Sequence, residues 1–275
     1  MSVFSLVILT LVGIFAGAFG SMLGLGGGII LVPALFYLPS LISGVPPITP
    51  QLAVGTSLML IIITSLSSTL SYSKKKLIDV SSALLFFVGS APGSILGAWL
   101  STRFDSKSFT LYYGLFMLLM LVILTYRKRL SPRNMNWKIT KTYVDVSGQT
   151  YTYGYSRSLA IIIAFVVGTM SSVFGIGGGA LLVPFMLVLF RFPPHMAAAT
   201  SMLVILLSSI VGSVTHVVLG HIIWSAVLAI APGAWIGGKL GSALAGKLPG
   251  NRIELILRLV LLFLAIRMLW HGLVA

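Results

Sequence analysis

Long apolar segments, separated by short polar stretches, make up most of the sequence. Residues 1–72 and 158–190 contain no charged residue, and both runs exceed the roughly 20 residues that a helix needs to cross a bilayer. The pattern predicts an all-α polytopic membrane protein with five helical segments in each half of the chain. These segments lie at about 3–23, 27–42, 52–72, 78–101 and 108–126, then at 158–174, 177–191, 195–219, 222–246 and 252–272.

Three segments occur twice, in the same order. The first is a glycine-rich decamer, which reads GLGGGIILVP at residues 24–33 and GIGGGALLVP at residues 175–184. The other two pairs are PQLAVGTS (50–57) with PHMAAATS (194–201), and APGSILG (91–97) with APGAWIG (231–237). Such a repeat predicts two homologous halves.

The repeat divides the chain into a first transmembrane repeat at residues 1–126, a polar connector at 127–157 and a second transmembrane repeat at 158–275. The connector contains the segment KITKTYVDVSGQTYTYGY, which is rich in Thr, Tyr and Val and has Ser147–Gly148 in its middle. This composition predicts a β-hairpin that turns at these two residues. The alternative is a disordered polar loop.

Basic residues in the loops predict the orientation of the chain, because cytoplasmic loops carry an excess of Lys and Arg. If the basic connector is cytoplasmic, five elements per half place most other basic loop residues inside as well: Lys74, Lys75, Lys76, Arg191, Lys247 and Arg252. Arg103 and Lys107 oppose the rule. An odd number of elements makes the halves inverted-topology repeats, with both termini outside.

The second segment of each half is short and contains Pro33 or Pro184, so we expect a broken or partial helix there. The prediction is therefore 5+5 elements that form about 8–10 transmembrane helices, with broken or half helices among them. Interrupted helices in inverted repeats are typical of secondary transporters, whose site lies at the repeat interface. Both prolines are accordingly candidates for gating.

The charge balance is strongly basic, with 18 Lys and Arg against 4 Asp and Glu. We expect no nucleic-acid partner, because these basic residues cluster in the loops of a membrane protein. The absence of cysteine excludes disulfides and thiolate metal sites. No carboxylate lies deep in an apolar segment, and no paired carboxylates, metal cluster or nucleophile triad is found, so we expect no enzyme, no metal and no cofactor.

The decamers do not match nucleotide-binding motifs, because Ile29 and Ala180 stand where the last glycine of G-x-G-x-x-G belongs. Glycines in a membrane can instead end one helix, leave N–H groups free and begin another helix whose positive end attracts anions. Close helix packing through small residues is the alternative. The candidate substrate-binding glycines are Gly24, Gly26, Gly27, Gly28, Gly175, Gly177, Gly178 and Gly179.

Polar residues of the third segment in each half are further candidates. Thr56–Ser57 and Thr200–Ser201 could donate to an anion, or only to a carbonyl of their own helix. Gln51 occupies the position equivalent to His195, and both can donate a hydrogen bond. His195, and His216 farther along the segment, are also candidates for gating or coupling because histidine titrates near neutral pH.

Two G-x-G-G-G-x-x-x-V-P decamers, each followed by P-[HQ]-x-A-x-x-T-S and A-P-G-x-x-x-G, resemble the TauE/SafE family of sulfite and organosulfur-anion exporters. The resemblance covers nearly all of both halves, but not the connector. It implies transport of sulfite, sulfonates such as sulfoacetate, or related oxyanions across the cytoplasmic membrane. The resemblance implies binding roles for the decamers and for the segment from His195 to Ser201. In the first half, Gln51 stands where the second half has this histidine.

The combined hypothesis is a secondary transporter that exports a small sulfur-containing anion by alternating access between the halves. An anion channel, or a transporter of another small oxyanion or carboxylate, is the first alternative; an intramembrane enzyme or an assembly factor is the second. The expected partners are the anion and the lipid bilayer, with homo-oligomerisation left open. The expected location is the cell membrane, with a multi-pass chain.

Overall fold

The computed structural model describes residues 3–41, 48–126, 137–144, 150–245 and 250–274. The first half contains α1 (Val3–Leu23), α2 (Gly28–Leu41), α3 (Pro50–Lys74), α4 (Val80–Ser101) and α5 (Ser106–Tyr126). The strands β1 (Ile139–Val144) and β2 (Thr150–Tyr155) follow, and then α6 (Arg157–Phe174), α7 (Gly179–Val188), α8 (Pro194–Val218), α9 (Trp224–Leu244) and α10 (Gly250–Val274). The ten helices coincide, within a few residues at each end, with the ten predicted apolar segments.

Local sequence explains where several helices begin. Thr49 caps α3 by accepting a hydrogen bond from the Leu52 N–H, and Pro50 occupies the first position, where a helix needs no N–H donor. Asp79 caps α4 in the same way, by accepting from the Ser82 N–H. These two caps fix the starts of two long helices of the first half.

Seven helices in the described part of the chain are long and apolar enough to cross a membrane: α1, α3, α4, α5, α6, α8 and α9. The apolar parts of α2 and α7 are shorter, at Gly28–Tyr37 and Gly179–Val188. The prediction of an all-α polytopic membrane protein is therefore confirmed, and the second element of each half is short, as expected.

The two halves pack against each other reciprocally. The first helix of each half lies along the fourth helix of the other, so that α1 contacts α9 and α6 contacts α4. The third helices, α3 and α8, contact each other, and so do the fifth helices, α5 and α10. Exchanging the halves therefore leaves the pattern of contacts unchanged.

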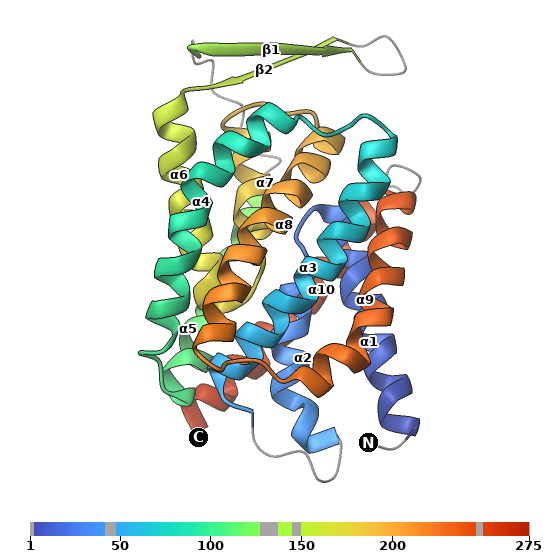
Figure 1. Cartoon of the computed structure of the whole chain (residues 1–275), viewed down its shortest axis with the longest axis vertical. Helices are drawn as coiled ribbons and strands as arrows, with labels where there is room; N and C mark the ends of the chain where they lie inside the picture. Colours follow the sequence, from blue (N-terminus) through green and yellow to red (C-terminus); the bar gives the residue numbers. More distant parts are fainter. Residues whose placement is uncertain (1–2, 42–47, 127–136, 145–149, 246–249, 275) are drawn as a thin grey trace.

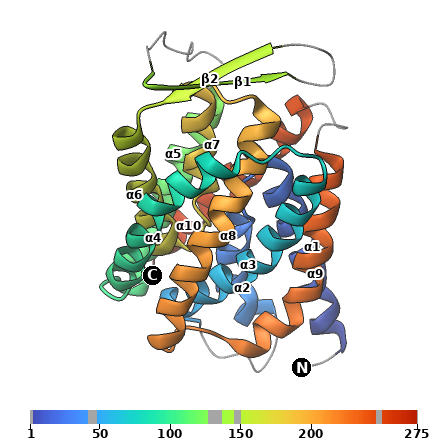
Figure 2. The ribbon, with the colours of Figure 1, turned by 45° about the horizontal axis from the view of Figure 1, so that its top comes forward.

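The corresponding helices run in opposite directions. In Figure 1, α1 rises from the end of the bundle that holds both termini, whereas α6 descends from the hairpin at the other end. The turned view in Figure 2 likewise shows the hairpin across one end and the termini at the other. An inverted repeat would have this arrangement; the inverted topology relative to a membrane stays a prediction.

Small residues bring the paired helices close together. A Cβ on Gly93 of α4 would collide with the Phe165 carbonyl oxygen of α6, and one on Gly237 of α9 would collide with the Ile14 carbonyl oxygen of α1. Such contacts are typical of membrane helices, where van der Waals packing replaces the hydrophobic effect. The two equivalent interfaces are thus built with the same device.

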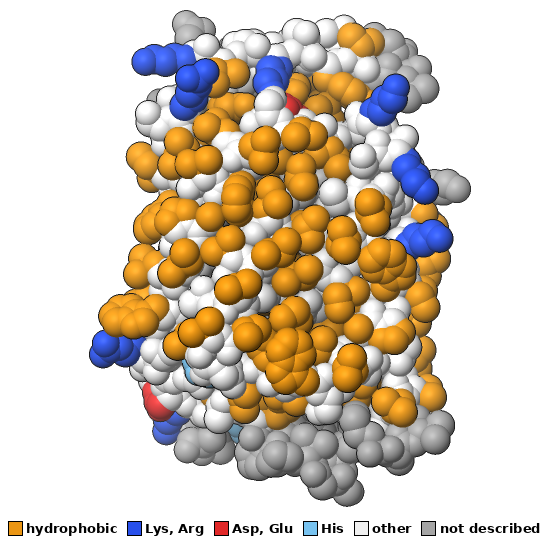
Figure 3. All heavy atoms as spheres, viewed as in Figure 1, with side chains coloured by type: hydrophobic (Ala, Val, Ile, Leu, Met, Phe, Trp, Pro, Cys, Tyr) orange, Lys and Arg blue, Asp and Glu red, His pale blue; other side chains and the backbone are white. Residues whose placement is uncertain are grey.

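Apolar side chains cover the outside of the bundle. Figure 3 shows hydrophobic atoms across the middle of one face, with Lys and Arg toward its two ends. Val88, Leu228 and Phe263 are each more than half exposed. So broad an apolar surface is unsuited to water, and it fits a belt of lipid around the helices.

Candidate functional site

The two decamers form the turns that join α1 to α2 and α6 to α7. Three glycines in each turn have positive φ angles: 72°, 82° and 88° at Gly24, Gly26 and Gly27, and 67°, 83° and 70° at Gly175, Gly177 and Gly178. L-residues rarely adopt this conformation, so the backbone strongly favours glycine here. The helix breaks lie at these glycines, whereas α2 and α7 continue through Pro33 and Pro184.

Several N–H groups of the turns are left without an acceptor. The N–H groups of Leu25 and Ile176 close the ends of α1 and α6 by donating to carbonyls of those helices. Those of Gly27, Gly177 and Gly178 have no hydrogen-bond acceptor among the described residues. They lie at the beginnings of α2 and α7, where the helix dipole and free N–H groups favour negative charge.

The decamers of the two halves contact each other directly. A Cβ on Gly28 would lie less than 3.0 Å from the Gly175 carbonyl oxygen, and a Cβ on Gly179 would lie equally close to the Gly24 carbonyl oxygen. The two contacts are equivalent under exchange of the halves. The glycine turns therefore cross in the interior of the bundle.

Two isoleucines flank this crossing. A Cβ on Gly26 would lie 3.2 Å from Ile205 and 3.3 Å from Ile61, and a Cβ on Gly177 would lie 3.1 Å from Ile61 and 3.4 Å from Ile205. Ile61 belongs to α3 and Ile205 to the equivalent position of α8. The crossing is thus apolar where it meets these two side chains.

The serine of each Thr-Ser pair holds the decamer of the opposite half. The Ser57 hydroxyl donates to the Gly175 carbonyl oxygen at 2.8 Å, and the Ser201 hydroxyl donates to the Gly24 carbonyl oxygen at 3.0 Å. Both serines are fully buried. The predicted hydroxyls and glycines therefore do lie together, but here each serine hydroxyl donates to backbone.

We expect the variant Ser57→Ala to lower the free energy of unfolding by about 1–3 kcal/mol, because the Gly175 carbonyl loses a buried partner. Ser65→Ala is the matched control, since the Ser65 hydroxyl donates only to carbonyls of its own helix, at Ile61 and Ile62. The measurement is thermal unfolding of the two purified variants. Equal stability of both would contradict a structural role of the Ser57 hydrogen bond.

The threonines of the pairs hold the starts of two other helices. The Thr56 hydroxyl accepts from the Ile223 N–H at 2.9 Å, and the Thr200 hydroxyl accepts from the Asp79 N–H at 3.1 Å. Ile223 and Asp79 are the residues that precede α9 and α4. Each Thr-Ser pair therefore ties three elements together, across the interface of the halves.

Gln51 and His195 lie apart from the crossing, in the first turns of α3 and α8. The Gln51 amide nitrogen donates to the Phe104 carbonyl at 2.7 Å and to the Ser101 carbonyl at 3.2 Å. His195 is exposed near the hairpin end of the bundle. The structure thus separates these equivalent residues from the glycines, and their binding roles stay predictions.

His216 has a partner that sequence reasoning missed. Its Nδ1 lies 3.3 Å from Nδ1 of His221, in the turn between α8 and α9. Burial lowers the pKa of His221, which favours its neutral form. No three His, Asp or Glu side chains of the described chain could jointly hold a metal ion.

A small cavity lies beside the second decamer. It has a volume of about 10 Å³, enough for about one water molecule. Gly177 and Gly178 line it, together with Ser90 of α4 and Ser208 of α8. The cavity adjoins two of the unpaired N–H groups, so it is the place where the second turn can meet a small polar molecule.

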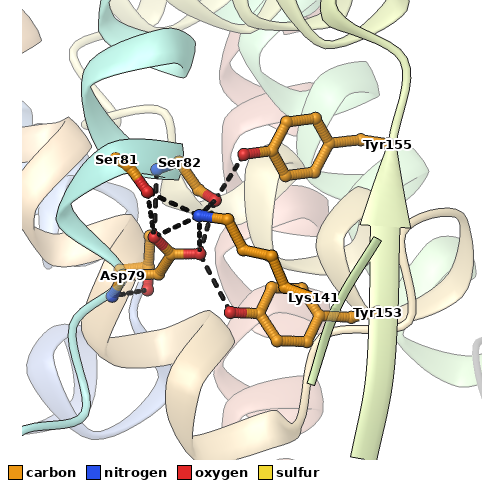
Figure 4. Close-up of polar contacts among 7 residues, drawn as sticks. Asp79, Ser81, Ser82, Lys141, Tyr153 and Tyr155 are labelled. Carbon is orange, nitrogen blue, oxygen red and sulfur yellow. Dashed lines mark hydrogen bonds and ion pairs between the residues drawn. The ribbon is translucent and has the colours of Figure 1, made fainter. Parts of the chain in front are cut away.

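The polar connector forms an antiparallel hairpin in which Ile139 pairs with Tyr155 and Val144 with Thr150. Figure 4 shows how it docks on the beginning of α4: the Lys141 ammonium donates to both Asp79 carboxylate oxygens at 2.8 Å, and the Tyr153 hydroxyl donates to one of them at 2.9 Å. Because the Asp79 N–H also binds Thr200, the hairpin is linked to one of the Thr-Ser pairs.

The docking of the hairpin should depend on the charge of Asp79. Burial alone would raise the pKa of this carboxyl, but hydrogen bonds from Lys141 and Ser82 outweigh it and lower the pKa from 3.8 to about 2. A carboxyl whose pKa is lowered on docking stabilises the docked hairpin at pH values above its undocked pKa. This contribution is lost as the pH falls from about 4 toward 2.

Trp137 packs on Phe190. We therefore expect its fluorescence to change over that pH range from that of the docked hairpin to that of the undocked hairpin. The measurement uses a chain in which Trp137 is the only tryptophan. Lys141→Met should loosen the hairpin at neutral pH, whereas Lys138→Met, at an exposed position of the connector, should not. A hairpin equally well docked in both variants would contradict the role of the ion pair.

Comparison with known proteins finds relatives along almost the whole chain. The family model described as "Sulfite exporter TauE/SafE" matches residues 9–268. The "Probable membrane transporter protein YunE" of Bacillus subtilis (strain 168) is 48% identical over 269 residues, which cover 98% of both chains. A "Probable membrane transporter protein" of Xylella fastidiosa (strain Temecula1) is 24% identical over 274 residues, 99% of this chain and 98% of the relative. No solved structure matches the chain significantly.

Proposed function

The chain belongs to the TauE/SafE family and is a membrane transporter of that type, and from this premise we propose that it exports a small sulfur-containing anion, such as sulfite or sulfoacetate, by alternating access. The observation that carries the proposal is the reciprocal crossing of the two glycine turns. Gly28 lies against the Gly175 carbonyl and Gly179 against the Gly24 carbonyl. A crossing of equivalent turns between two halves is where a carrier places its substrate.

The chemistry of the crossing favours an anion. Free N–H groups of Gly27, Gly177 and Gly178 lie at helix beginnings, and such groups can replace part of the hydration shell of an oxyanion. The formal net charge of the whole chain is +14. No acidic side chain lies within a described membrane-spanning helix, so nothing charged repels an anion there.

The hydrogen bonds at the crossing supply the contacts that an alternating carrier must exchange. Ser57 and Ser201 each donate to the decamer of the opposite half, through equivalent bonds. Opening one side of the bundle would break one bond and keep the other, at similar cost. The equivalence of the two bonds therefore supports two accessible states of comparable free energy.

The membrane potential can supply the energy for export. With an inside-negative potential, moving one negative charge outward gains about 2.3 kcal/mol per 100 mV. In this proposal the hairpin and the basic residues around it face the cytoplasm, and both termini lie outside, as the loop charges predict. The cell membrane is the corresponding location.

The test is uptake of ³⁵S-labelled sulfite, thiosulfate, sulfoacetate and sulfate into liposomes that contain the purified chain, with acetate as a carboxylate comparison. We expect saturable transport of at least one sulfur-containing anion that a positive potential inside the liposome accelerates. Transport of acetate alone would indicate that the substrate is a carboxylate. Transport of none of the five would contradict the proposal.

A further inference from the structure

Three buried serine hydroxyls in the second half lack hydrogen-bond partners and lie beside a buried histidine. The cluster, called the second-half polar cluster below, consists of Ser172 on α6 and of Ser209, Ser213 and His216 on α8. The exposed fractions of these residues are 1%, 1%, 1% and 0%. The three hydroxyls meet no partner in the described part of the chain. Leaving so many polar groups unpaired is costly, which calls for an explanation.

The four side chains face one another. Ser209, Ser213 and His216 are spaced four and three residues apart, so they lie on one face of α8. Ser172 approaches the same face, because a Cβ on Gly212 would lie 3.2 Å from the Ser172 hydroxyl. The cluster therefore spans the gap between α6 and α8.

Ser21 and Tyr72, the equivalents of Ser172 and His216, belong to a bonded network in the first half. Ser68 donates to the Ser21 hydroxyl at 2.6 Å, and Ser21 donates to the Gly238 carbonyl at 2.9 Å. The Tyr72 hydroxyl donates to the Ser21 carbonyl at 3.0 Å. Thr69 is also unpartnered there, but it is only half-buried. Ser21, Ser68 and Tyr72 thus bond one another and the Gly238 carbonyl of α9.

One substitution between the halves removes part of this network from the second half. Gly212 stands at the position of Ser68, whereas His216, at the position of Tyr72, still has a hydrogen bond with the Ser172 backbone. The hydroxyl of Ser172, the equivalent of Ser21, consequently lacks the hydroxyl partner that Ser68 gives to Ser21. The asymmetry is local, because the decamers and Thr-Ser pairs on either side of it keep equivalent contacts.

The cluster lies between the level of the cavity and one end of the bundle. Ser208 lines the cavity beside Gly177 and Gly178, and Ser209, the next residue, points to another side of α8. At the other end, His216 contacts His221, which is partly exposed in the turn before α9. Polar side chains therefore occur along α8 from the level of the cavity to the end of the bundle that holds the termini.

We propose that the second-half polar cluster is a binding site for a small oxyanion on its way between the glycine turn and the outer surface; this rests on the transport function proposed above. Three hydroxyls can each donate to an oxyanion without carrying a fixed charge. Such neutral donors bind an anion and still release it. A cation is disfavoured, because no carboxylate lies among the described residues of these helices.

The test compares two serine truncations at equivalent positions. Ser209→Ala removes an unpartnered donor of the cluster, whereas Ser65→Ala removes its bonded counterpart in the first half. With sulfite as the probe and calorimetry on the full chain in detergent, we expect Ser209→Ala to weaken binding roughly tenfold or more, the effect of one hydrogen bond to a charged group. Ser65→Ala should bind sulfite as the wild type does.

The variant Gly212→Ser places in the second half the serine that the first half has at the equivalent position, Ser68. Its Cβ would fit with small shifts, 3.2 Å from the Ser172 hydroxyl and 3.5 Å from Leu58. The new hydroxyl should bind Ser172, as Ser68 binds Ser21. We expect an unchanged or higher unfolding temperature together with weaker sulfite binding, a combination that a purely structural role of the cluster would not produce.

Three results would overturn the inference. If Ser209→Ala and Ser65→Ala bind sulfite equally well, the cluster is not an anion site although the transport function stands. If Na⁺ stabilises the wild type but not Ser209→Ala while sulfite affinity is unchanged, the cluster binds a cation. If the wild type neither binds nor transports any of sulfite, thiosulfate and sulfoacetate, both the anion site and the proposed transport function are wrong.

Discussion

Replacing Gly179 by alanine is expected to prevent most of the protein from reaching its folded state. The added Cβ would collide with the Gly24 carbonyl oxygen, which is backbone and cannot rotate away. Overpacking a buried site with movable side chains already costs about 1–3 kcal/mol. A collision between two backbones at the crossing should cost more, against a typical total stability of about 5–15 kcal/mol.

The measurement is the yield of monodisperse protein in detergent and its thermal unfolding. Gly220→Ala is the matched control: Gly220 also has a positive φ angle, 73°, but no atom lies within 4 Å of the added Cβ. The control should therefore show only the backbone strain, about 1–2 kcal/mol. If Gly179→Ala folds as well as Gly220→Ala, the two glycine turns do not cross as described.

Replacing Gly177 by alanine is expected to leave the protein folded but to lower the rate of anion transport at least about tenfold. A tenfold loss corresponds to an increase of about 1.4 kcal/mol in the activation free energy of transport. The nearest atoms to the added Cβ would belong to the side chains of Ile61 and Ile205, at 3.1–3.4 Å, and these can shift. The same methyl group would narrow the cavity at an unpaired N–H group. An anion that uses this N–H group should therefore pass more slowly.

The initial rate of ³⁵S-sulfite uptake into liposomes measures this effect, again with Gly220→Ala as the control for backbone strain. The variant also separates the two interpretations of the decamer that the sequence leaves open. If the glycines serve helix packing alone, a Gly177→Ala protein that folds should transport at the wild-type rate. That result would remove the N–H groups of this turn from the transport path.

The apolar pattern was sufficient to predict the ten helices, because a membrane-spanning helix is a local feature of about 20 residues. The repeat also predicted that the two decamers would act at one place, and Gly28 and Gly179 do contact the decamer of the opposite half. Such a prediction needs only the equivalence of the halves. It requires no knowledge of individual side-chain contacts.

The partners of the polar groups could not be predicted in the same way. Ser57 donates to Gly175, which is 118 residues away, and Asp79 pairs with Lys141 of the connector. These contacts depend on how the halves and the hairpin pack, and no local pattern encodes that packing. His221 was missed for a related reason, since a single histidine in a polar turn gives no sign of its contact with His216.

In the proposed mechanism, the two halves carry an anion by exposing the crossing of the glycine turns to each side of the membrane in alternation. Counterflow tests this most directly: liposomes loaded with unlabelled sulfite are placed in a trace of ³⁵S-sulfite at fixed potential. An alternating carrier predicts faster and transiently concentrative uptake of label, which Gly177→Ala should lose. Uptake of label that is the same with and without sulfite inside would contradict alternating access and indicate a channel.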